Sequence, residues 1–489
     1  MVTLVAVLAA GAGIPMSAGA GGTASRHHVV IDGVPLDEVH PRALRPGASG
    51  RRPGVVVAHG FAGSARLMTP FADTLAARGY VVVLLDFGGH GTATRPMDGD
   101  AGLQRDLDTA TRHLRGLPDV DPSRVAVVGH SMGAGAAVRY GATHPDVGAT
   151  VALSLPDASD VRPNRPRRLL VLVGGLEFAG FRDAARRAAE TGGGREVVVP
   201  AVEHVTILYA PRAHREVVGW LDGAFGDTAG RLPSPVRRPA GAALLMLAFV
   251  LGFVPLIRAV LGPARPRPWP TVPAIGLAMA VSGGVAVVAA LVAAVVPTTR
   301  LPIAIGGYLV GFTALTGVGL VVGHRLSGHG PSGHRREAPS VGSPAEVRSA
   351  RRLGVAAPLL VAYAGAAIAV PLHLGVAQAV PVGPRWWLLL LIWAGFAVLA
   401  FGAELLTARS GVGLLAVSAV ATIVLTAAAV AGLTSGFVLL VVPLLAALMA
   451  WQALWSGMLY AHDAPAWLVA PVGALVVAWP VAVTLPLTA

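Results

Sequence analysis

The sequence predicts an α/β domain with a doubly wound, mostly parallel sheet, followed by an all-α polytopic transmembrane domain. Two observations lead to this prediction. Short β-branched runs alternate with helical patterns through residues 26–226, which requires a mostly parallel sheet covered by helices on both faces. From residue 240 onward, long apolar runs are separated by short loops, and each run is near the roughly 20 residues that cross a bilayer. The expected domains are a signal anchor or signal peptide (1–22), the α/β domain (26–226), a linker (227–239) and about eight transmembrane helices (240–489).

Composition supports a membrane protein. The 489 residues are 54% hydrophobic, and the formal net charge is +12, with arginine supplying all 38 basic residues. A nucleic-acid partner would need basic residues grouped with aromatic ones on one face, whereas many of these arginines stand beside apolar runs. We therefore expect a membrane and no nucleic acid as partners. The sequence has no cysteine, which excludes both a disulfide framework and a thiolate metal site.

Residues 2–20 are apolar or small but lack the basic residues that begin a signal peptide. Ala18-Gly19-Ala20 resembles a small-residue cleavage site. The segment is either a signal peptide or a short first span, and the missing basic residues favour an uncleaved anchor.

The α/β domain begins with one or two edge strands in residues 26–41, followed by a Pro/Gly/Arg-rich loop. Apolar runs predict further strands at 55–58, 80–85, 125–128, 150–155, 169–173 and 196–199. Helical patterns cover 64–78, 100–115, 134–140, 181–190 and 211–225, and a turn is expected at 119–123. In such sheets ligands bind at the carboxyl ends of the strands, so chemistry-bearing residues that follow a strand are the candidates for a site.

The string GHSMG, residues 129–133, stands at a predicted strand-to-helix corner. Glycines on both sides of the serine let the strand meet the helix closely, because a Cβ there would have no room. Ser131 is therefore the candidate nucleophile. The backbone N–H of Met132 can face a developing oxyanion, and so can that of Phe61, which follows His59-Gly60 at the end of an earlier strand.

A serine hydroxyl needs a neighbouring base, and three histidines follow Ser131 in the sequence. His204 is the candidate base, because it follows the strand 196–199 on a loop at the carboxyl ends. His144 follows the helix predicted at 134–140, directly after Ser131, and is therefore expected toward the end of the sheet opposite the carboxyl ends of the strands. His214 falls early in the last helix, where a packed or solvated histidine is expected.

The base needs an orienting carboxylate. Glu177 follows the strand 169–173 and is the candidate acid, with Asp157 and Asp160 as rivals after the preceding strand. Asp183 is expected on a helix face. Other polar residues near strand ends are expected to pack, hydrogen-bond or form turns: His59, His130, Asp86 and His90.

Residues 26–226 resemble the α/β-hydrolase superfamily, particularly its dienelactone-hydrolase-like and small serine esterase branch. The resemblance is carried by HGFAG (59–63), DFGGHG (86–91), DVDPSRVAVVGHSMGAGAA (119–137), LLVLVGGLE (169–177) and EHVTILYAPRAHREVVGWL (203–221). It implies an α/β-hydrolase sheet and no metal or organic cofactor. By this resemblance Ser131 is the nucleophile, His204 the base and Glu177 the acid, with Phe61 and Met132 as oxyanion donors.

The sequence departs from the family at two points. The acid is a glutamate, where aspartate is usual. The connection 155–168 is short and rich in Pro and Arg, so the cap that many relatives insert there is expected to be absent and the pocket open.

Eight apolar spans are expected in the second half, at about 240–262, 272–296, 302–323, 354–378, 386–406, 412–433, 437–459 and 465–486. The loop 324–352 and the loop after the first span are rich in arginine and lie two spans apart, so the positive-inside bias places both in the cytoplasm. The α/β domain is then extracytoplasmic, although Arg231, Arg237 and Arg238 argue the other way. Of the ionisable residues in the spans, Arg258 and Glu404 are expected near span ends and His373 inside a span, more as a packing residue than on a solute pathway.

These features predict a multi-pass protein of the cell membrane that is a membrane-anchored serine hydrolase, cleaving an ester or related acyl bond through a covalent acyl-enzyme. The substrate class is a small-molecule or lipid acyl compound. One alternative is an acyltransferase to a lipid or envelope acceptor. Another is a transporter or signalling membrane protein whose hydrolase-like domain only binds a ligand.

Overall fold

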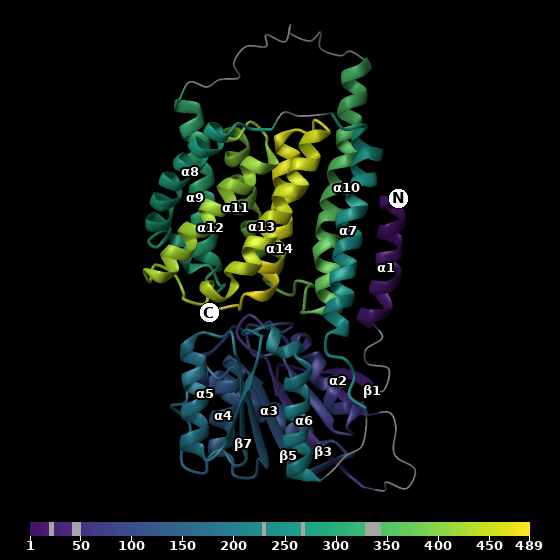
Figure 1. Cartoon of the computed structure of the whole chain (residues 1–489), viewed down its shortest axis with the longest axis vertical. Coiled ribbons are helices and arrows are strands. Elements are labelled where there is room, and N and C mark those ends of the chain that lie inside the picture. The colour runs from purple at the N-terminus through teal and green to yellow at the C-terminus, as the bar shows by residue number, and fades with distance from the viewer. Residues whose placement is uncertain (19–23, 42–49, 227–230, 266–268, 328–343) are drawn as a thin grey trace. The chain divides into compact units, whose positions relative to one another are not determined.

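The computed structural model describes residues 1–18, 24–41, 50–226, 231–265, 269–327 and 344–489 (Figure 1). Its contacts divide the chain into two compact units. The sheet unit consists of Gly11–Leu244, Pro371–Gly383 and Thr484–Ala489, and the helical unit of Met1–Ala10, Leu245–Val370 and Pro384–Val483. Most of the expected cleavage site, part of the expected linker, and Arg267, Arg335 and Arg336 of the arginine-rich loops lie outside the described residues.

The sheet has eight strands in the order β1-β2-β4-β3-β5-β6-β7-β8. Their bounds are β1 Ala24–Ile31, β2 Val34–Pro41, β3 Arg52–Ala58, β4 Val81–Leu85, β5 Val120–His130, β6 Ala149–Leu153, β7 Leu169–Gly174 and β8 Arg195–Val199. β1 and β2 form an antiparallel hairpin, and β2 also pairs antiparallel with β4. All other neighbours are parallel. The predicted fold class, a mostly parallel doubly wound sheet, is confirmed.

Helices cover both faces of the sheet, which explains why its central strands are continuous apolar runs. The helices are α2 Thr69–Ala77, α3 Gly99–Gly116, α4 Met132–Thr143, α5 Ala179–Gly192 and α6 Pro211–Phe225, with a 3-10 turn at Ala65–Met68 before α2 and another at Thr206–Tyr209 before α6. Side chains of α2 and α6 pack on one face; Phe71 of α2 and Leu221 of α6 belong to the same core cluster as Val55 of β3. Those of α3, α4 and α5 pack on the other. Alternate strand residues therefore supply one core cluster on the first face and two on the second.

The turn expected at residues 119–123 is wrong in its position. The turn lies at residues 118–119 and overlaps the expected one only at Asp119, because β5 begins at Val120, which pairs with Arg52. The register then shifts, and regular pairing resumes at Gly54 with Val125. The residues skipped by this shift are held locally, because Asp121 accepts hydrogen bonds from Ser123 and Arg124. Asp and Ser residues that make such local hydrogen bonds are typical of turns, so the sequence favours a turn here. In the structure these residues are nevertheless part of β5.

The chain begins with a short apolar helix, α1 Val2–Ala18. In the part of the chain that the structure describes, eight helices are long and apolar enough to cross a membrane, which indicates a multi-pass membrane protein. They are α7 Arg237–Leu261, α8 Val272–Ala293, α9 Gly306–Leu326, α10 Pro344–Gly375 (apolar from Leu353), α11 Arg385–Leu406, α12 Gly411–Val430, α13 Val438–Ala461 and α14 Ala466–Thr484. Each lies within a few residues of an expected span.

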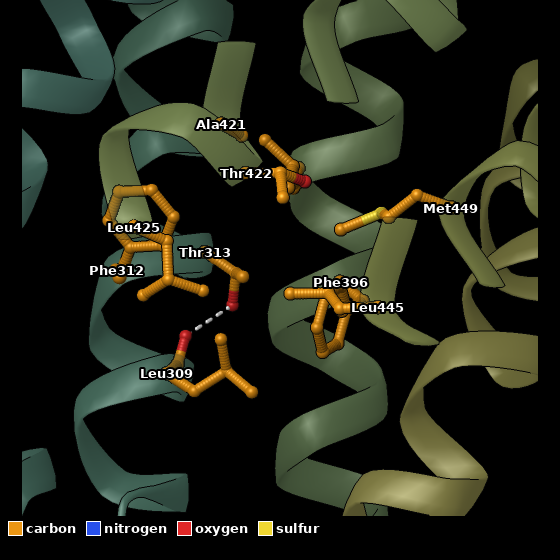
Figure 2. Close-up of a pocket in the computed structure, with 10 residues that line it drawn as sticks. Leu309, Phe312, Thr313, Phe396, Ala421, Thr422, Leu425, Leu445 and Met449 are labelled. Carbon is orange, nitrogen blue, oxygen red and sulfur yellow. Dashed lines mark hydrogen bonds between the residues drawn. The ribbon is translucent and has the colours of Figure 1, made fainter. Parts of the chain in front are cut away.

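A small pocket lies inside the helical unit between α9, α11, α12 and α13 (Figure 2). Its lining is mainly apolar, with Phe312, Phe396 and Met449 among the larger side chains. The Thr313 hydroxyl in its wall donates to the carbonyl oxygen of Leu309, one turn earlier in the same helix, at 2.8 Å. Because that hydroxyl is already bonded within its own helix, the pocket presents chiefly apolar surface.

Two ionisable residues, Glu404 and His373, lie in the helices that are able to cross a membrane. Glu404 stands near the end of α11, as expected, but it is completely buried inside the helical unit. His373 lies within the apolar stretch Leu353–Gly375, as expected, and stands in the last turn of α10, close to the end of that stretch. Local hydropathy predicted the helices, but it did not predict which of their side chains are buried.

Candidate active site

Ser131 occupies a strained corner between β5 and α4. Its backbone has φ 53° and ψ −118°, a conformation that costs a non-glycine residue about 1–3 kcal/mol. A Cβ on Gly129 would overlap the backbone of Gly133, and one on Gly133 would overlap the carbonyl oxygen of His59. The two glycines therefore allow the sharp turn that presents the Ser131 side chain at the carboxyl end of the sheet.

The structure brings Ser131, His204 and Glu177 together. The Nε2 atom of His204 lies 2.9 Å from Oγ of Ser131, and its Nδ1 lies 3.0 Å from Oε2 of Glu177. A carboxylate only accepts, so Nδ1 carries the hydrogen and Nε2 is left to accept from the serine hydroxyl. The Glu177 side chain is fully buried and that of His204 is 9% exposed. This arrangement can withdraw a proton from the serine.

Ser154 also binds the Glu177 carboxylate, and sequence reasoning missed it. Its hydroxyl donates to Oε1 of Glu177 at 2.7 Å, and the backbone N–H of Gly174 donates to the same oxygen at 2.7 Å. Oε2 therefore remains for His204. Ser154 follows β6 directly, the same strand-end position that marked Glu177 and His204, so the available signal was its place at the end of a strand.

The ring of His204 is held by two neighbouring rings and a backbone bond. Its centroid lies 4.6 Å from that of Phe181 and 4.9 Å from that of His130. His130 donates from Nε2 to the carbonyl oxygen of His204 at 2.8 Å. Burial, together with repulsion from a charged His204, lowers the pKa of His130 to about 3, so its ring stays neutral. His130 packs and hydrogen-bonds, as expected.

The loop after β3, residues 59–65, lies against Ser131. A Cβ on Gly60 would stand 2.9 Å from Cβ of Ser131, so the backbone that leads into Phe61 approaches the serine closely. Met132 is the first residue of α4, and N–H groups in the first turn of a helix have no partner within the helix. The two expected oxyanion donors therefore come from segments that flank the serine.

His59 and Asp86 fix this loop, in agreement with their expected turn-forming and packing roles. His59 is completely buried, donates from Nδ1 to the Gly60 carbonyl at 2.8 Å, and accepts from the Phe87 N–H at Nε2 over 3.1 Å. Burial lowers the pKa of His59, which keeps it neutral for both bonds. Asp86 accepts from the Ala65 N–H at 2.7 Å. The segment that contains Asp86 and His90 therefore supports the loop that contains Phe61.

The rival residues lie elsewhere. His144 stacks on Tyr140, and His214 is buried between the Thr74 hydroxyl and the Leu208 carbonyl. The rival carboxylates bind partners outside the site: Asp157 binds Ser159, Asp160 binds Arg139 and Asp183 binds Arg186.

Residues 154–168, all of which the structure describes, contain no helix or strand beyond one isolated bridge between Arg162 and Arg165. The connection between β6 and β7 therefore supplies no cap domain, as the short sequence there predicted. Within the described ranges, no group of three or more His, Asp or Glu side chains has an arrangement that could hold a metal ion.

Comparison with known proteins agrees with this fold. Residues 50–176 match a family model described as serine aminopeptidase, S33. Two uncharacterized proteins of Mycobacterium tuberculosis strains, CDC 1551 / Oshkosh and H37Rv, are each 30% identical over 159 residues, which is 32% of this chain and 56% of each relative. The quorum-quenching protein AidA of Acinetobacter baumannii is 32% identical over 96 residues, 19% of this chain and 31% of that protein. The chain thus spans about half the length of the two Mycobacterium tuberculosis relatives and about a third of the length of AidA.

Among solved structures, a predicted CIB-like hydrolase from Thermoplasma acidophilum aligns with 16% identity and a TM-score of 0.35, covering 41% of this chain and 98% of that one.

Proposed function

We propose that this chain, which carries an α/β-hydrolase domain together with eight helices able to cross a membrane, is a membrane-anchored serine hydrolase with Ser131 as its nucleophile. The observation that carries the proposal is the continuous hydrogen-bonded series from the Ser131 hydroxyl through both nitrogens of His204 to Glu177. A serine is a weak nucleophile near neutral pH unless a positioned base takes its proton, and this series provides the base and its orienting acid.

In the proposed reaction, Oγ of Ser131 attacks the carbonyl carbon of an acyl substrate while Nε2 of His204 takes the hydroxyl proton. The negative charge that forms on the carbonyl oxygen is stabilised by the backbone N–H groups of Phe61 and Met132. The leaving group departs with the proton from His204, and an acyl-enzyme remains. Water then attacks the acyl carbon and gives a proton to His204. His204 passes this proton to Oγ of Ser131 as the bond between the acyl carbon and Oγ breaks, which releases the acid and restores the free serine.

Glu177 holds the proton on Nδ1 of His204 throughout and stabilises the imidazolium that forms in each step. Its second oxygen is occupied by Ser154 and Gly174, so the carboxylate cannot rotate away from the histidine without leaving these donors unpaired. This fixed orientation supports a catalytic rather than a purely structural glutamate.

We propose a small-molecule or lipid ester, or a related acyl compound, as substrate. The short connection between β6 and β7 supports a site open to substrates of varied size. The family description names a serine aminopeptidase, so amide substrates belong in the same test. A panel of short and long acyl esters, lactones and aminoacyl amides separates these classes on one preparation.

A fluorophosphonate probe tests the nucleophile directly, because it forms a covalent bond only with an activated serine. The full chain in detergent should be labelled, Ser131→Ala should not, and Ser159→Ala, which changes an exposed serine outside the site, should be labelled like the wild type. Equal labelling of the wild type and Ser131→Ala would refute the assignment. Product analysis with added lipid acceptors then distinguishes hydrolysis from transfer, since a transferase yields an acylated acceptor.

We further propose that the protein resides in the cell membrane with the hydrolase domain outside the cytoplasm, on the basis of the arginine-rich loops after the first and third spans. Protease added to intact cells should then degrade the hydrolase domain. Protection in intact cells with cleavage only after lysis would place the domain inside.

A further inference from the structure

Two segments from the second half of the sequence, outside the α/β domain, belong to the sheet unit. They are Pro371–Gly383, which contains the end of α10 and the loop before α11, and Thr484–Ala489, which follows α14. Both are well buried at their contact points: Ala379 is completely buried, and Leu487 is 2% exposed. Their contacts are made with the loop after β3, which carries the proposed oxyanion donor Phe61, and with the loop after β4.

The C-terminal segment binds the loop after β4 through its backbone. The N–H of Leu487 donates to the carbonyl oxygen of Gly89 at 2.8 Å, and the carbonyl oxygen of Leu487 accepts from the N–H of Met97 at 2.8 Å. Gly89 has a φ of +77°, and a Cβ there would overlap the Leu487 carbonyl oxygen. Leu487 therefore bridges the two ends of this loop by both of its main-chain groups.

The segment before α11 binds the loop after β3. The backbone N–H of Gln378 donates to Oγ of Ser64 at 3.2 Å, across 314 positions of sequence. The same segment also touches the loop after β4, since a Cβ on Gly383 would stand 3.3 Å from Cγ2 of Thr94. The Gln378 side chain closes the turn by donating to the Val380 carbonyl at 3.1 Å.

These two loops are joined to each other and lie against Ser131. Ala65, next to Ser64, donates to Asp86, and His59 accepts from Phe87. The ring of His90, next to Gly89, lies 5.9 Å from the ring of Phe61. Both contact points therefore lie close to Phe61: Ser64 is in the same loop, and Gly89 is next to His90, whose ring faces that of Phe61.

We infer that Leu487 and Gln378 are positioning residues for the proposed hydrolase reaction: they hold the loops after β3 and β4 so that the oxyanion donor stays in place beside Ser131. This inference rests on the proposed function. The residues touch no reacting atom and act through Gly89, Met97 and Ser64. The isolated domain 26–226 would lack both contacts.

The inference is tested on the full chain in detergent with two independent pairs of variants. Deletion of residues 485–489 removes Leu487, whereas deletion of 488–489 keeps it and is the matched control. Ser64→Ala removes the acceptor for Gln378, and Ser64→Thr restores a hydroxyl. If the deletion 485–489 fails to fold, the Ser64 pair still decides the question.

Two measurements are made on each variant. In the 485–489 deletion, hydrogen exchange at the Met97 amide should become at least about tenfold faster, because the hydrogen bond to Leu487 is lost. In Ser64→Ala, exchange in the segment 59–65 should become faster to a similar extent, because the hydrogen bond from Gln378 is lost. The kcat for an active ester should fall about 10- to 100-fold with little change in KM, since misplaced oxyanion donors affect the transition state. The 488–489 deletion and Ser64→Thr should stay near wild type.

Unchanged exchange in both defective variants overturns the inference. A change in KM with kcat intact also overturns it, because it assigns the segments to substrate binding. A wild-type protein that turns over no substrate refutes the proposed function, and the exchange rates alone then decide whether the two segments hold the loops.

Discussion

The hydroxyl of Ser154 donates a 2.7 Å hydrogen bond to Oε1 of Glu177, on the side of the carboxylate that faces away from His204. Both residues are buried. Because Ser154 has a φ of 55°, its main chain, like that of Ser131, is held in a conformation that L-residues rarely adopt. The Glu177 carboxylate is therefore held by a second serine, which takes no part in the proton transfers of the proposed reaction.

Ser154→Ala should lower kcat about tenfold while leaving the protein folded, since a hydrogen bond to a charged group contributes about 1.5–3 kcal/mol. The lost bond lets the Glu177 carboxylate turn away from His204 during part of the catalytic cycle. Steady-state kinetics on an ester measure the effect. Ser159→Ala, in an exposed loop serine, serves as the control, and equal kcat values for the two variants would contradict a positioning role for Ser154.

Glu177→Gln should lower kcat about 10³- to 10⁴-fold, because an amide no longer holds the proton on Nδ1 of His204 or stabilises its charged form. Fluorophosphonate labelling of Ser131 should slow in parallel. Glu190→Gln removes an exposed carboxylate on α5 and should have wild-type kinetics. If Glu177→Gln keeps more than a tenth of the wild-type kcat, Glu177 is not the acid of the proposed series.

Ser131→Gly should give a more stable protein than Ser131→Ala, by about 1 kcal/mol in the free energy of unfolding, because glycine relieves the strain of a φ of 53°. Both variants should be inactive and unlabelled. Thermal unfolding of the two proteins in the same detergent provides the comparison. A lower melting temperature for Ser131→Gly would mean that the corner is not strained.

Acid should destabilise the sheet unit between about pH 6.5 and pH 4, through His214. Burial lowers the pKa of His214 to about 4. In the folded protein its neutral ring accepts a hydrogen bond from the Thr74 hydroxyl and donates one to the Leu208 carbonyl. In the unfolded chain the ring binds a proton below its ordinary pKa of about 6.5. The unfolded state therefore binds more protons across this window, and stability falls as pH falls through it, by on the order of 3 kcal/mol.

Thermal unfolding at pH 7.5, 6 and 4.5 tests this expectation. His214→Gln should flatten the pH dependence, whereas His28→Gln, on an exposed edge strand, should leave it unchanged. The same slope in His214→Gln as in the wild type would assign the acid sensitivity to other groups.

The local sequence determined the strands, the helices and three members of the candidate site. The run before GHSMG could form a buried strand because its residues are apolar and β-branched, and the two glycines could turn sharply only where a Cβ is absent. Ser131, Glu177 and His204 each follow a parallel strand, and the carboxyl ends of parallel strands lie on one edge of a sheet. The sequence therefore placed all three at the same edge of the sheet.

Only the tertiary structure decided how each group is held. A serine after a strand, such as Ser154, carries no periodic signal that distinguishes it from any loop serine, so its bond to Glu177 depends on which strands become neighbours. The same is true of Gln378, whose partner Ser64 lies 314 positions away, and of Glu404, whose burial depends on helix packing. Local propensity acts over a few residues, whereas these contacts depend on how the finished elements pack against one another.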